Sequence, residues 1–484
     1  MHVIILSRAF FLLCLVILAS CAAVGPDYTP PAMAPPAGWT NLDTSARPVT
    51  HPDPVADISQ WWENLDDPLL IALVEEALLN SPDVRSAQAK LWEARARRGV
   101  AVSEFFPNLA ASGNARRSQS SKEVGSGTTR ELFNAGFDAA WELDFFGGVR
   151  RSVEAAGASF ESSIARLHDA QVTLTAEVGR NYMDFRTVQL RLRIARENLA
   201  TQSETLQLTE WRAQAGLVSS QDVEQARGNL EQTRAQIPNL ETSLAEAGHR
   251  LDVLLGQTPG TLQARLTPSG DLPAVPEGIA VGIPADILRQ RPDVRAAERT
   301  LAAETARIGA AEAARYPAFN LSGTIGFEAL SLGALGSSGT GTSSLLAGIS
   351  APIFDAGRLR GQVEIQNAVR EQALVAYEQV VLEALEEVEN ALVALARNRE
   401  RVRALANAVE AERNAAEMAR QRYSSGLIDF QSVLDTERSV LSVEDNLATA
   451  RADGVLTLIS LYKALGGGWS WQTEAARPER TSHE

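Results

Sequence analysis

Histidine and cysteine, two residue types that often carry catalysis, are sparse in this chain, with five and two residues. The five histidines fit neither a metal-ligand pattern nor a nucleophile–histidine–acid pattern. His168 and His249 fall within helical patterns, so we interpret them as helix-surface residues. The glycine-rich stretch 323–341 lacks the Gly-Lys-Ser/Thr sequence of a phosphate-binding loop. We therefore predict no enzyme activity, no metal site and no cofactor.

Cys21 stands at a position that favours covalent modification of its thiol. Residues 1–20 contain Arg8 and then an apolar run, which is the layout of a secretory signal and too short to span a membrane. A buried N-terminal helix is the alternative. Leu18-Ala19-Ser20-Cys21 resembles a bacterial lipobox, in which the cysteine accepts diacylglycerol after cleavage. Cys14 would leave with the signal, so we expect an acylated chain that begins at Cys21 and has no disulfide.

A second group of polar residues lies between Leu132 and Phe145, where the sequence alternates with period two. A strand of about 13 residues with one apolar side and one acidic or small side is typical of a transmembrane β-barrel. A soluble antiparallel strand is the alternative. We expect the acids to face the lumen, or solvent, and the aromatics to form a membrane girdle, or to be buried in a core. The acids are Asp138, Glu142 and Asp144, and the aromatics are Phe133, Trp141 and Phe145.

The elements that position these residues occur twice, 210 residues apart. Pro82-Asp83-Val84-Arg85 recurs as Pro292-Asp293-Val294-Arg295, and matches at this offset continue as far as Gly256 and Gly466. Each repeat contains a predicted strand pair, at 108–116 and 132–145 in the first repeat and at 319–328 and 344–354 in the second. The predicted order is a signal peptide (1–20), a lipid-anchored extended segment with a first helix (21–81), repeat 1 (82–256), a connector (257–291), repeat 2 (292–466) and a tail (467–484).

A very long helix follows each strand pair. Apolar heptads run from Ile164 to Leu206 and from Leu374 to Ala416. They predict helices from Arg150 to about Ala213 and from Arg360 to about Tyr423, each on the order of 90–100 Å long. Each helix ends near a glycine, and a second helix returns, with Pro238 expected to kink the first return helix. Four strands cannot close a barrel, and lipid cannot satisfy the unpaired groups of an open sheet edge. Three copies of the chain would supply twelve strands.

Several motifs together carry a resemblance to a known family. They are Val24-Gly25-Pro26-Asp27-Tyr28 after Cys21, Trp61-Trp62 with Asp67-Pro68-Leu69, Trp141-Glu142-Leu143-Asp144-Phe145-Phe146-Gly147, and Pro352-Ile353-Phe354-Asp355-Ala356-Gly357-Arg358. The sequence resembles outer-membrane efflux channels of the TolC type, in their lipoprotein branch. The resemblance implies an α+β membrane protein, in which a trimeric twelve-stranded β-barrel continues into an α-helical coiled-coil barrel in the periplasm. It also implies a passive conduit that serves an inner-membrane pump, of the RND type, through a periplasmic adaptor.

The hairpin turns hold the residues that the resemblance assigns to adaptor docking. A leucine follows the glycine at each turn, and an arginine lies one helical turn earlier. A glycine after a helix is also a common C-terminal cap, which explains both glycines without any partner. We expect the leucines to be exposed and to dock the adaptor together with the arginines. The candidate docking residues are Arg212, Gly216, Leu217, Arg422, Gly426 and Leu427.

Acidic residues follow each turn and are candidates for a periplasmic gate. Asp222 and Asp435 lie early in the return helices, where a carboxylate also favours the helix dipole. In a trimer an inward aspartate becomes a ring of three like charges, which attracts cations. The resemblance places the periplasmic constriction at Asp435, with Arg438 one turn on as a possible partner. We expect a closed tip that the adaptor opens.

Charge and organisation separate this interpretation from its alternatives. A net charge of −15 argues against nucleic-acid binding. Ala22 follows Cys21 where an aspartate would retain a lipoprotein at the inner membrane, which favours the outer membrane. A periplasmic adaptor lipoprotein is one alternative, but it would have one hairpin and no long amphipathic strands. An outer-membrane channel for polypeptide secretion is another, and drugs, solvents and metal ions all remain possible cargoes.

Overall fold

The computed structural model describes residues 23–32, 35–42, 50–51, 58–268, 270–276, 278–282 and 284–469. The expected signal peptide, Cys21 and the end of the tail lie outside these residues. The chain divides into two compact units. The first contains the described residues up to Ala32 with Lys90–Ile164 and Arg295–Gln379, and the second contains the described residues of 33–89, 165–294 and 380–469.

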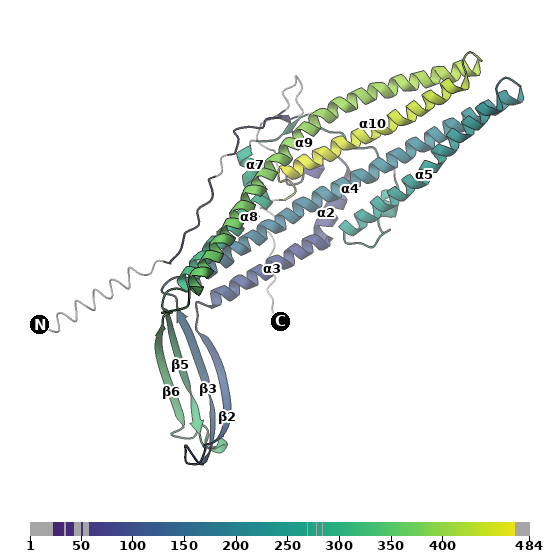
Figure 1. Ribbon diagram of the computed structural model, residues 1–484. Coiled ribbons are helices and arrows are strands. Elements are labelled where there is room, and N and C mark those ends of the chain that lie inside the picture. Colours follow the sequence, from purple (N-terminus) through teal and green to yellow (C-terminus); the bar gives the residue numbers. More distant parts are fainter. Residues whose placement is uncertain are drawn as a thin grey trace. The chain divides into compact units, whose positions relative to one another are not determined.

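The order of elements repeats with an offset of 210 residues (Figure 1). Four elements of the first half have counterparts of the same length that begin 210 residues later, so the repeat in the sequence is also a repeat of structure. The pairs are α3 (Pro82–Ser103) with α8 (Pro292–Ala313), β2 (Asn108–Gln119) with β5 (Ala318–Ala329), α4 (Gly148–Gln214) with α9 (Arg358–Ser424), and α5 (Ser220–Leu254) with α10 (Phe430–Ala464).

The remaining elements are the second strand of each pair, β3 and β6, and the elements that precede, connect or interrupt the repeats. They are β1 (Thr50–His51), η1 (Trp61–Leu65), α2 (Pro68–Asn80), β3 (Thr129–Leu143), α6 (Gln263–Leu266), β4 (Ile279–Ala280), α7 (Pro284–Gln290), η2 (Leu332–Ala334) and β6 (Gly341–Ser350). Strands β1 and β4 form a small parallel pair. Among the helices that the structure describes, none is long and apolar enough to cross a membrane.

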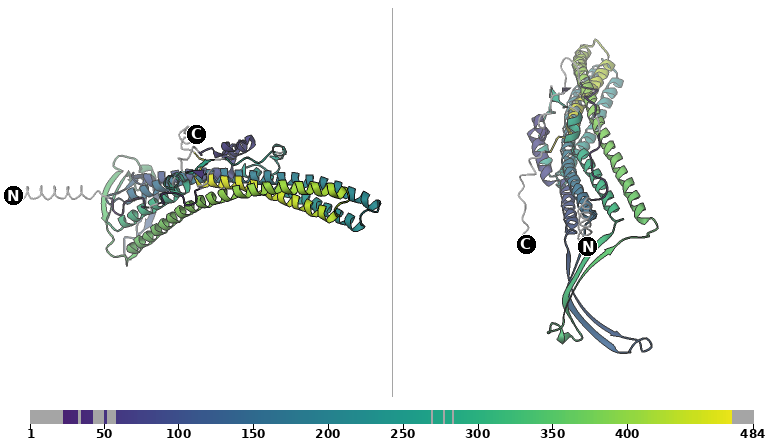
Figure 2. Two further views of the ribbon diagram at one scale, coloured as in Figure 1. Left: turned by 90° about the horizontal axis from the view of Figure 1, so that it is seen from above. Right: turned by 90° about the vertical axis from the view of Figure 1, so that its left-hand side faces the viewer.

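The four long strands form one antiparallel sheet in the first unit, in the order β2-β3-β5-β6. Figure 2 shows that this sheet is curved. The register aligns apolar positions across all four strands, as in the row of Leu109, Ala139, Gly323 and Leu345. The opposite face carries Ala110, Asp138, Thr324 and Ser344 in the next row, so the sheet has one apolar and one mainly polar or small face.

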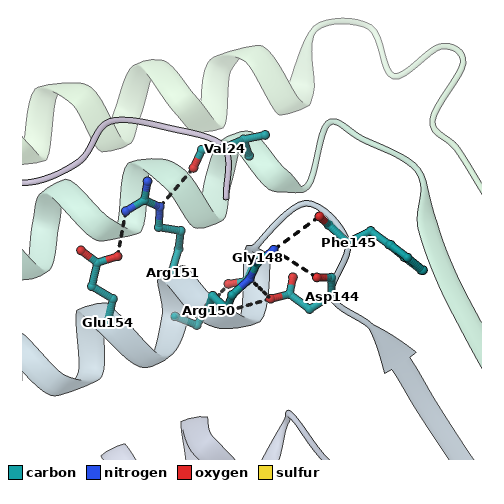
Figure 3. Close-up of polar contacts among 8 residues, drawn as sticks. Val24, Asp144, Phe145, Gly148, Arg150, Arg151 and Glu154 are labelled. Atoms are coloured by element: carbon teal, nitrogen blue, oxygen red, sulfur yellow. Dashed lines mark hydrogen bonds and ion pairs between the residues drawn. The ribbon is translucent and has the colours of Figure 1, made fainter. Parts of the chain in front are cut away.

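Two strands end earlier than the sequence predicts, each for a local reason. Strand β3 ends at Leu143 and not at Phe145. The Asp144 carboxylate accepts hydrogen bonds from the backbone N–H of Arg150 at 2.9 Å and from its Nε at 3.3 Å (Figure 3). Gly147 has a φ of +83°, which reverses the chain into α4. Strand β6 ends at Ser350, close to Pro352, which has no N–H for a further strand pair.

The largest apolar core of the described residues lies in the second unit and includes residues of the motif Trp61-Trp62 with Asp67-Pro68-Leu69. Trp61 is fully buried and stacks on Tyr462 with ring centroids 5.6 Å apart. Asp67 caps α2 by accepting from the N–H groups of Leu69 and Leu70, and its other oxygen accepts from the Tyr182 hydroxyl at 2.6 Å. These motif residues therefore fix α2 against α4. Helix α5 continues through Pro238 as one element.

Candidate functional site

The two hairpin turns have the same backbone geometry. Gly216 and Gly426 have φ values of +72° and +74°, which a residue with a side chain rarely adopts. The N–H groups of Leu217 and Leu427 donate to the carbonyls of Arg212 and Arg422, five residues earlier in each case. These are Schellman turns, which satisfy the last carbonyls of α4 and α9. The glycines are thus required by the turn itself, whatever binds there.

The side chains after the glycines are exposed. Leu217 and Leu427 are 67% and 73% exposed, whereas the next residues, Val218 and Ile428, are half-buried. The inner pair packs on a small apolar cluster between the hairpins, whose buried members are Ala226, Ala419, Tyr423, Phe430, Val433 and Leu434. Each tip therefore presents a leucine on a well-packed base, which suits a docking surface.

The two arginines at the tips have different surroundings. Arg212 is half-buried, with its guanidinium carbon 4.3 Å from the centre of the Tyr423 ring, and it donates a hydrogen bond to the Tyr423 carbonyl. Arg212 therefore joins α4 to the end of α9. Arg422 is exposed. The two arginines occupy equivalent positions of the repeats, but the tyrosine has no counterpart. Ala213 stands in the first repeat at the position of Tyr423 in the second.

Two acids near the turns cap helices. Ser219 and Asp222 form a capping box at the start of α5, in which Asp222 accepts from the Ser219 N–H at 3.0 Å and from its hydroxyl at 2.9 Å. Asp429 caps α10 by accepting from the N–H and hydroxyl of Ser432. These hydrogen bonds lower the pKa of Asp429. Both aspartates therefore hold the starts of the return helices.

Asp435 has no such capping role. Its carboxylate is exposed and accepts a hydrogen bond from the Gln431 side chain, one turn earlier, at 2.8 Å. Arg438 donates instead to the Asn229 side chain of α5 at 3.1 Å. The structure thus places Arg438 in a contact between α10 and α5, and it leaves the Asp435 carboxylate exposed.

A buried acid near the tip has no counterpart in the sequence predictions. Glu437 is 5% exposed and accepts a hydrogen bond from the Thr205 hydroxyl at 2.6 Å. Burial raises the pKa of Glu437, against the opposing effects of this hydrogen bond and of Arg420. Two further polar residues near the tip are also buried, Thr209 of α4 and Asn229 of α5. The sequence offers no signal for this acid, because Arg227 occupies the equivalent position in the first repeat.

The strand acids differ in their surroundings. Asp138 accepts a hydrogen bond from Ser112 of the neighbouring strand at 2.6 Å, and Glu142 is exposed and paired in register with Asn320. Asp144 differs from the expectation of a lumen-facing strand residue, because it lies beyond β3 and binds Arg150, with only 14% of its side chain exposed. Of these three acids, Asp138 and Glu142 therefore lie on the polar face of the sheet.

The girdle candidates lie toward both ends of β3. Phe133 is half-buried near the start of β3. The Trp141 indole donates to the Phe105 carbonyl at 3.0 Å, and Phe145, just past the strand, packs on Phe319 with centroids 4.6 Å apart. A tryptophan with an apolar body and a satisfied N–H is typical of a membrane interface. Among the described residues, no group of three or more His, Cys, Asp or Glu side chains could hold a metal ion.

Comparisons with known proteins agree with this architecture. The family model described as outer membrane efflux protein matches the chain twice, at residues 73–257 and 283–467, so the second match lies 210 residues after the first. The chain is 32% identical over 457 residues to nodulation protein T of Rhizobium leguminosarum bv. trifolii, covering 94% of this chain and 96% of that protein. It is 32% identical over 469 residues to the probable efflux pump outer membrane protein TtgC of Pseudomonas putida, covering 96% of each. The solved structure of the outer-membrane channel OprN superimposes with a TM-score of 0.87 at 39% identity, covering 93% of this chain and 100% of that one.

Proposed function

Because the chain belongs to the outer membrane efflux protein family, we propose that it is the outer-membrane channel of a tripartite efflux system. It forms a homotrimer in the outer membrane and extends into the periplasm. There it receives small molecules from an inner-membrane pump, of the RND type, through a periplasmic adaptor. The chain itself is a passive conduit that performs no catalysis, and the pump supplies the energy.

The observation that carries this proposal is the sheet with two open edges. Among the described strands, β2 pairs only with β3 and β6 pairs only with β5. Backbone groups along both edges need partners in lipid, because each unpaired N–H or C=O costs several kcal/mol there. Pairing β2 of one copy with β6 of the next satisfies both edges. Three copies then close a barrel of twelve antiparallel strands.

The proposal also assigns adaptor docking and the gate to the region of the hairpin tips, and the lipid anchor to Cys21. Leu217 and Leu427 dock the adaptor, with Arg422 at the rim of the same surface. Asp435 from three copies forms the charged ring at the periplasmic constriction, which is closed at rest. Cys21 carries the acyl group that anchors the mature chain in the outer membrane.

The proposal is tested by efflux in a Gram-negative strain that lacks TolC-type channels and carries the cognate pump and adaptor. The wild-type chain is expected to lower the accumulation of a fluorescent pump substrate. The double variant Leu217→Asp, Leu427→Asp loses this effect while its trimer content stays normal, because a charge at each tip disrupts apolar docking. Leu79→Asp, at a leucine of α2 that is 72% exposed, is the matched control and retains efflux. Normal efflux by the tip variant would contradict docking, and no efflux by the wild-type chain would contradict the function.

A further inference from the structure

Two arginines lie on the polar face of the four-stranded sheet, at the end where both strand hairpins turn. The register places the turns at 120–128 and 330–340 at this end, which Figure 1 shows away from the start of α4. Arg116 of β2 and Arg130 of β3 lie here, and both are exposed. Successive residues of a strand point to opposite faces, so the register of β2 and β3 puts both arginines on the face of Asp138.

The charged residues of this face are separated by sign along the strands. Asp138 and Glu142 lie toward the end of β3 that leads to α4, and Glu328 of β5 lies between them and the arginines. At about 3.4 Å per residue, the eight residues from Arg130 to Asp138 span about 27 Å. In the part of the chain that the structure describes, no hydrogen bond or ion pair engages the side chain of Arg116 or Arg130. Both guanidinium groups are therefore available to a ligand.

The neighbouring Arg117 differs from Arg116 in both its face and its pairing. It lies on the apolar face of β2, with Leu109, and its guanidinium is 3.5 Å from the carboxylate of Glu131, its partner in the register. Strand β2 thus carries a paired arginine on the apolar face beside an arginine on the polar face whose charge has no counter-ion among the described residues.

The second strand hairpin supplies no acid to this end of the sheet. From Ala329 to Ser350, through the turn and all of β6, the sequence contains no charged residue. In the proposed barrel, β6 of one copy pairs with β2 of the next, so Arg116 gains no carboxylate from the strand beside it. In the first turn Lys122 and Glu123 offset each other in charge. The end of the polar face where the hairpins turn therefore stays positive in a chain that is acidic as a whole.

We propose that Arg116 and Arg130 of three copies form an anion-binding ring at the outer mouth of the channel, which takes multivalent phosphate anions from the external medium. This inference rests on the trimeric barrel of the proposed function, in which the apolar face meets lipid and the polar face lines the lumen. Two arginines per copy give six guanidinium groups around one opening. A guanidinium binds phosphate oxygens through parallel N–H donors, and rings of arginine or lysine select anions and phosphates in pores.

The ring explains why a multivalent anion fits better than a single charge. Six like charges repel one another, and an anion with several phosphate groups relieves that repulsion at more than one point. The ring also repels cations that approach from outside, whereas Asp138 and Glu142 attract cations at the other end of the strands. The lumen of the barrel thus has opposite charge at its two ends.

The test is isothermal titration of the detergent-solubilised trimer with inorganic tripolyphosphate at low salt. The wild type is expected to bind about one tripolyphosphate per trimer. The double variant Arg116→Gln, Arg130→Gln should bind about tenfold more weakly or worse, because it removes all six guanidinium groups. Arg117→Gln is the matched control, since it removes an arginine of the same strand from the opposite face, and it should bind as the wild type does.

The outcomes separate this ring from other phosphate sites and from the proposed function. Unchanged binding by the double variant would overturn the ring, as would no binding by a wild type that native mass spectrometry shows to be a trimer. Weaker binding by Arg117→Gln alone would also overturn it, because it would place the site on the lipid-facing surface, where phosphates of lipid headgroups bind. If the double variant fails to assemble, Arg130→Gln decides, with about threefold weaker binding supporting the ring and unchanged binding refuting it. A wild-type monomer would contradict the proposed function and the ring together, and its mass distinguishes that failure from a trimer that does not bind.

Discussion

At the scale of single residues, equivalent positions of the two repeats have diverged in what they contact. Arg212 and Arg422 are related by the repeat, yet Arg212 lies on Tyr423 and donates to its carbonyl, whereas Arg422 is exposed. A cation over an aromatic ring and a charged hydrogen bond together stabilise the contact between α4 and α9. Arg212 is thus mainly a structural residue, and Arg422 remains available to a partner.

Arg212→Met is expected to loosen the tips by about 1–3 kcal/mol, since it removes both contacts with Tyr423. Chymotrypsin cleavage at the hairpin turns should then be roughly 5- to 140-fold faster, because each 1.4 kcal/mol corresponds to a factor of ten. Arg422→Met is the control and should be cleaved at the wild-type rate. Equal cleavage of both variants would show that the contact with Tyr423 contributes nothing.

Glu437 makes the stability of the tip depend on pH. Burial raises the pKa of Glu437, so the folded tip keeps this proton to a higher pH than the unfolded chain does. Its contribution is therefore most favourable below the unfolded pKa and is lost as the pH rises through the folded pKa. Glu437→Gln should make local opening of residues 430–440 rarer at neutral pH and leave it unchanged at about pH 4.

Hydrogen exchange of that segment, corrected for intrinsic rates, measures the effect. Glu410→Gln, at an exposed glutamate of α9, is the matched control and should behave as the wild type at both pH values. A Glu437→Gln variant that opens more readily at neutral pH would show that the carboxylate is stabilised in the folded state as a charged group.

At the scale of elements, the contact between the two strand hairpins depends on a pair of glycines. Gly136 of β3 faces Gly326 of β5, and a Cβ on Gly136 would lie 2.6 Å from the Ile325 carbonyl oxygen. Real Cβ atoms do not approach a backbone atom so closely. The curved sheet therefore leaves no room for side chains at this pair.

Gly136→Ala is expected to reduce the yield of folded trimer in the outer membrane severalfold, because β3 and β5 must separate to accept the methyl group. Gly113→Ala, on β2, is the control, since its Cβ would lie 3.9 Å from the nearest backbone oxygen. The measurement is the amount of trimer that stays intact in a detergent gel when the sample is not heated. Normal assembly of Gly136→Ala would contradict the close approach of the two strands.

Most elements were predictable from the sequence because their signals are local. The heptads and the glycines at 216 and 426 predict α4 and α9 to within about two residues at each end. Strand β2 was harder, because Asn108–Gln119 alternates weakly and becomes a strand by pairing with β3. The end of β3 was missed because Asp144 also fits the alternation, and the alternation gives no sign of its hydrogen bonds to Arg150.

For the candidate sites, the sequence predicts which residues lie at the turns and strands, but not what each side chain contacts. The leucines at the tips are exposed as the turn glycines suggested, and the adaptor that they dock is a proposal. The partner of Arg438 was not predictable, because Asn229 lies on another helix and 209 residues away in the sequence. Glu437 was missed for the same reason, since a distant helix, α4, supplies the Thr205 hydroxyl that it contacts.

At the scale of the whole molecule, a threefold assembly turns single side chains into rings. In the gate that we propose, three copies of the exposed Asp435 carboxylate concentrate negative charge at the periplasmic constriction, in a chain whose net charge is −15. The channel should therefore prefer cations. Asp435→Asn should lower the sodium-to-chloride permeability ratio about twofold or more, measured as reversal potentials in planar bilayers. Asp271→Asn, whose side chain is 93% exposed in the connector, is the control. Unchanged selectivity and resting conductance in Asp435→Asn would refute the ring.

The shared barrel is the central claim, because the sheet of one chain leaves both edges open. The most direct measurement is native mass spectrometry of the protein extracted from outer membranes in detergent, after expression with its own signal. The account predicts a trimer whose three subunits each begin at Cys21 and carry the added mass of the acyl chains. A monomer without lipid would contradict both the shared barrel and the anchor.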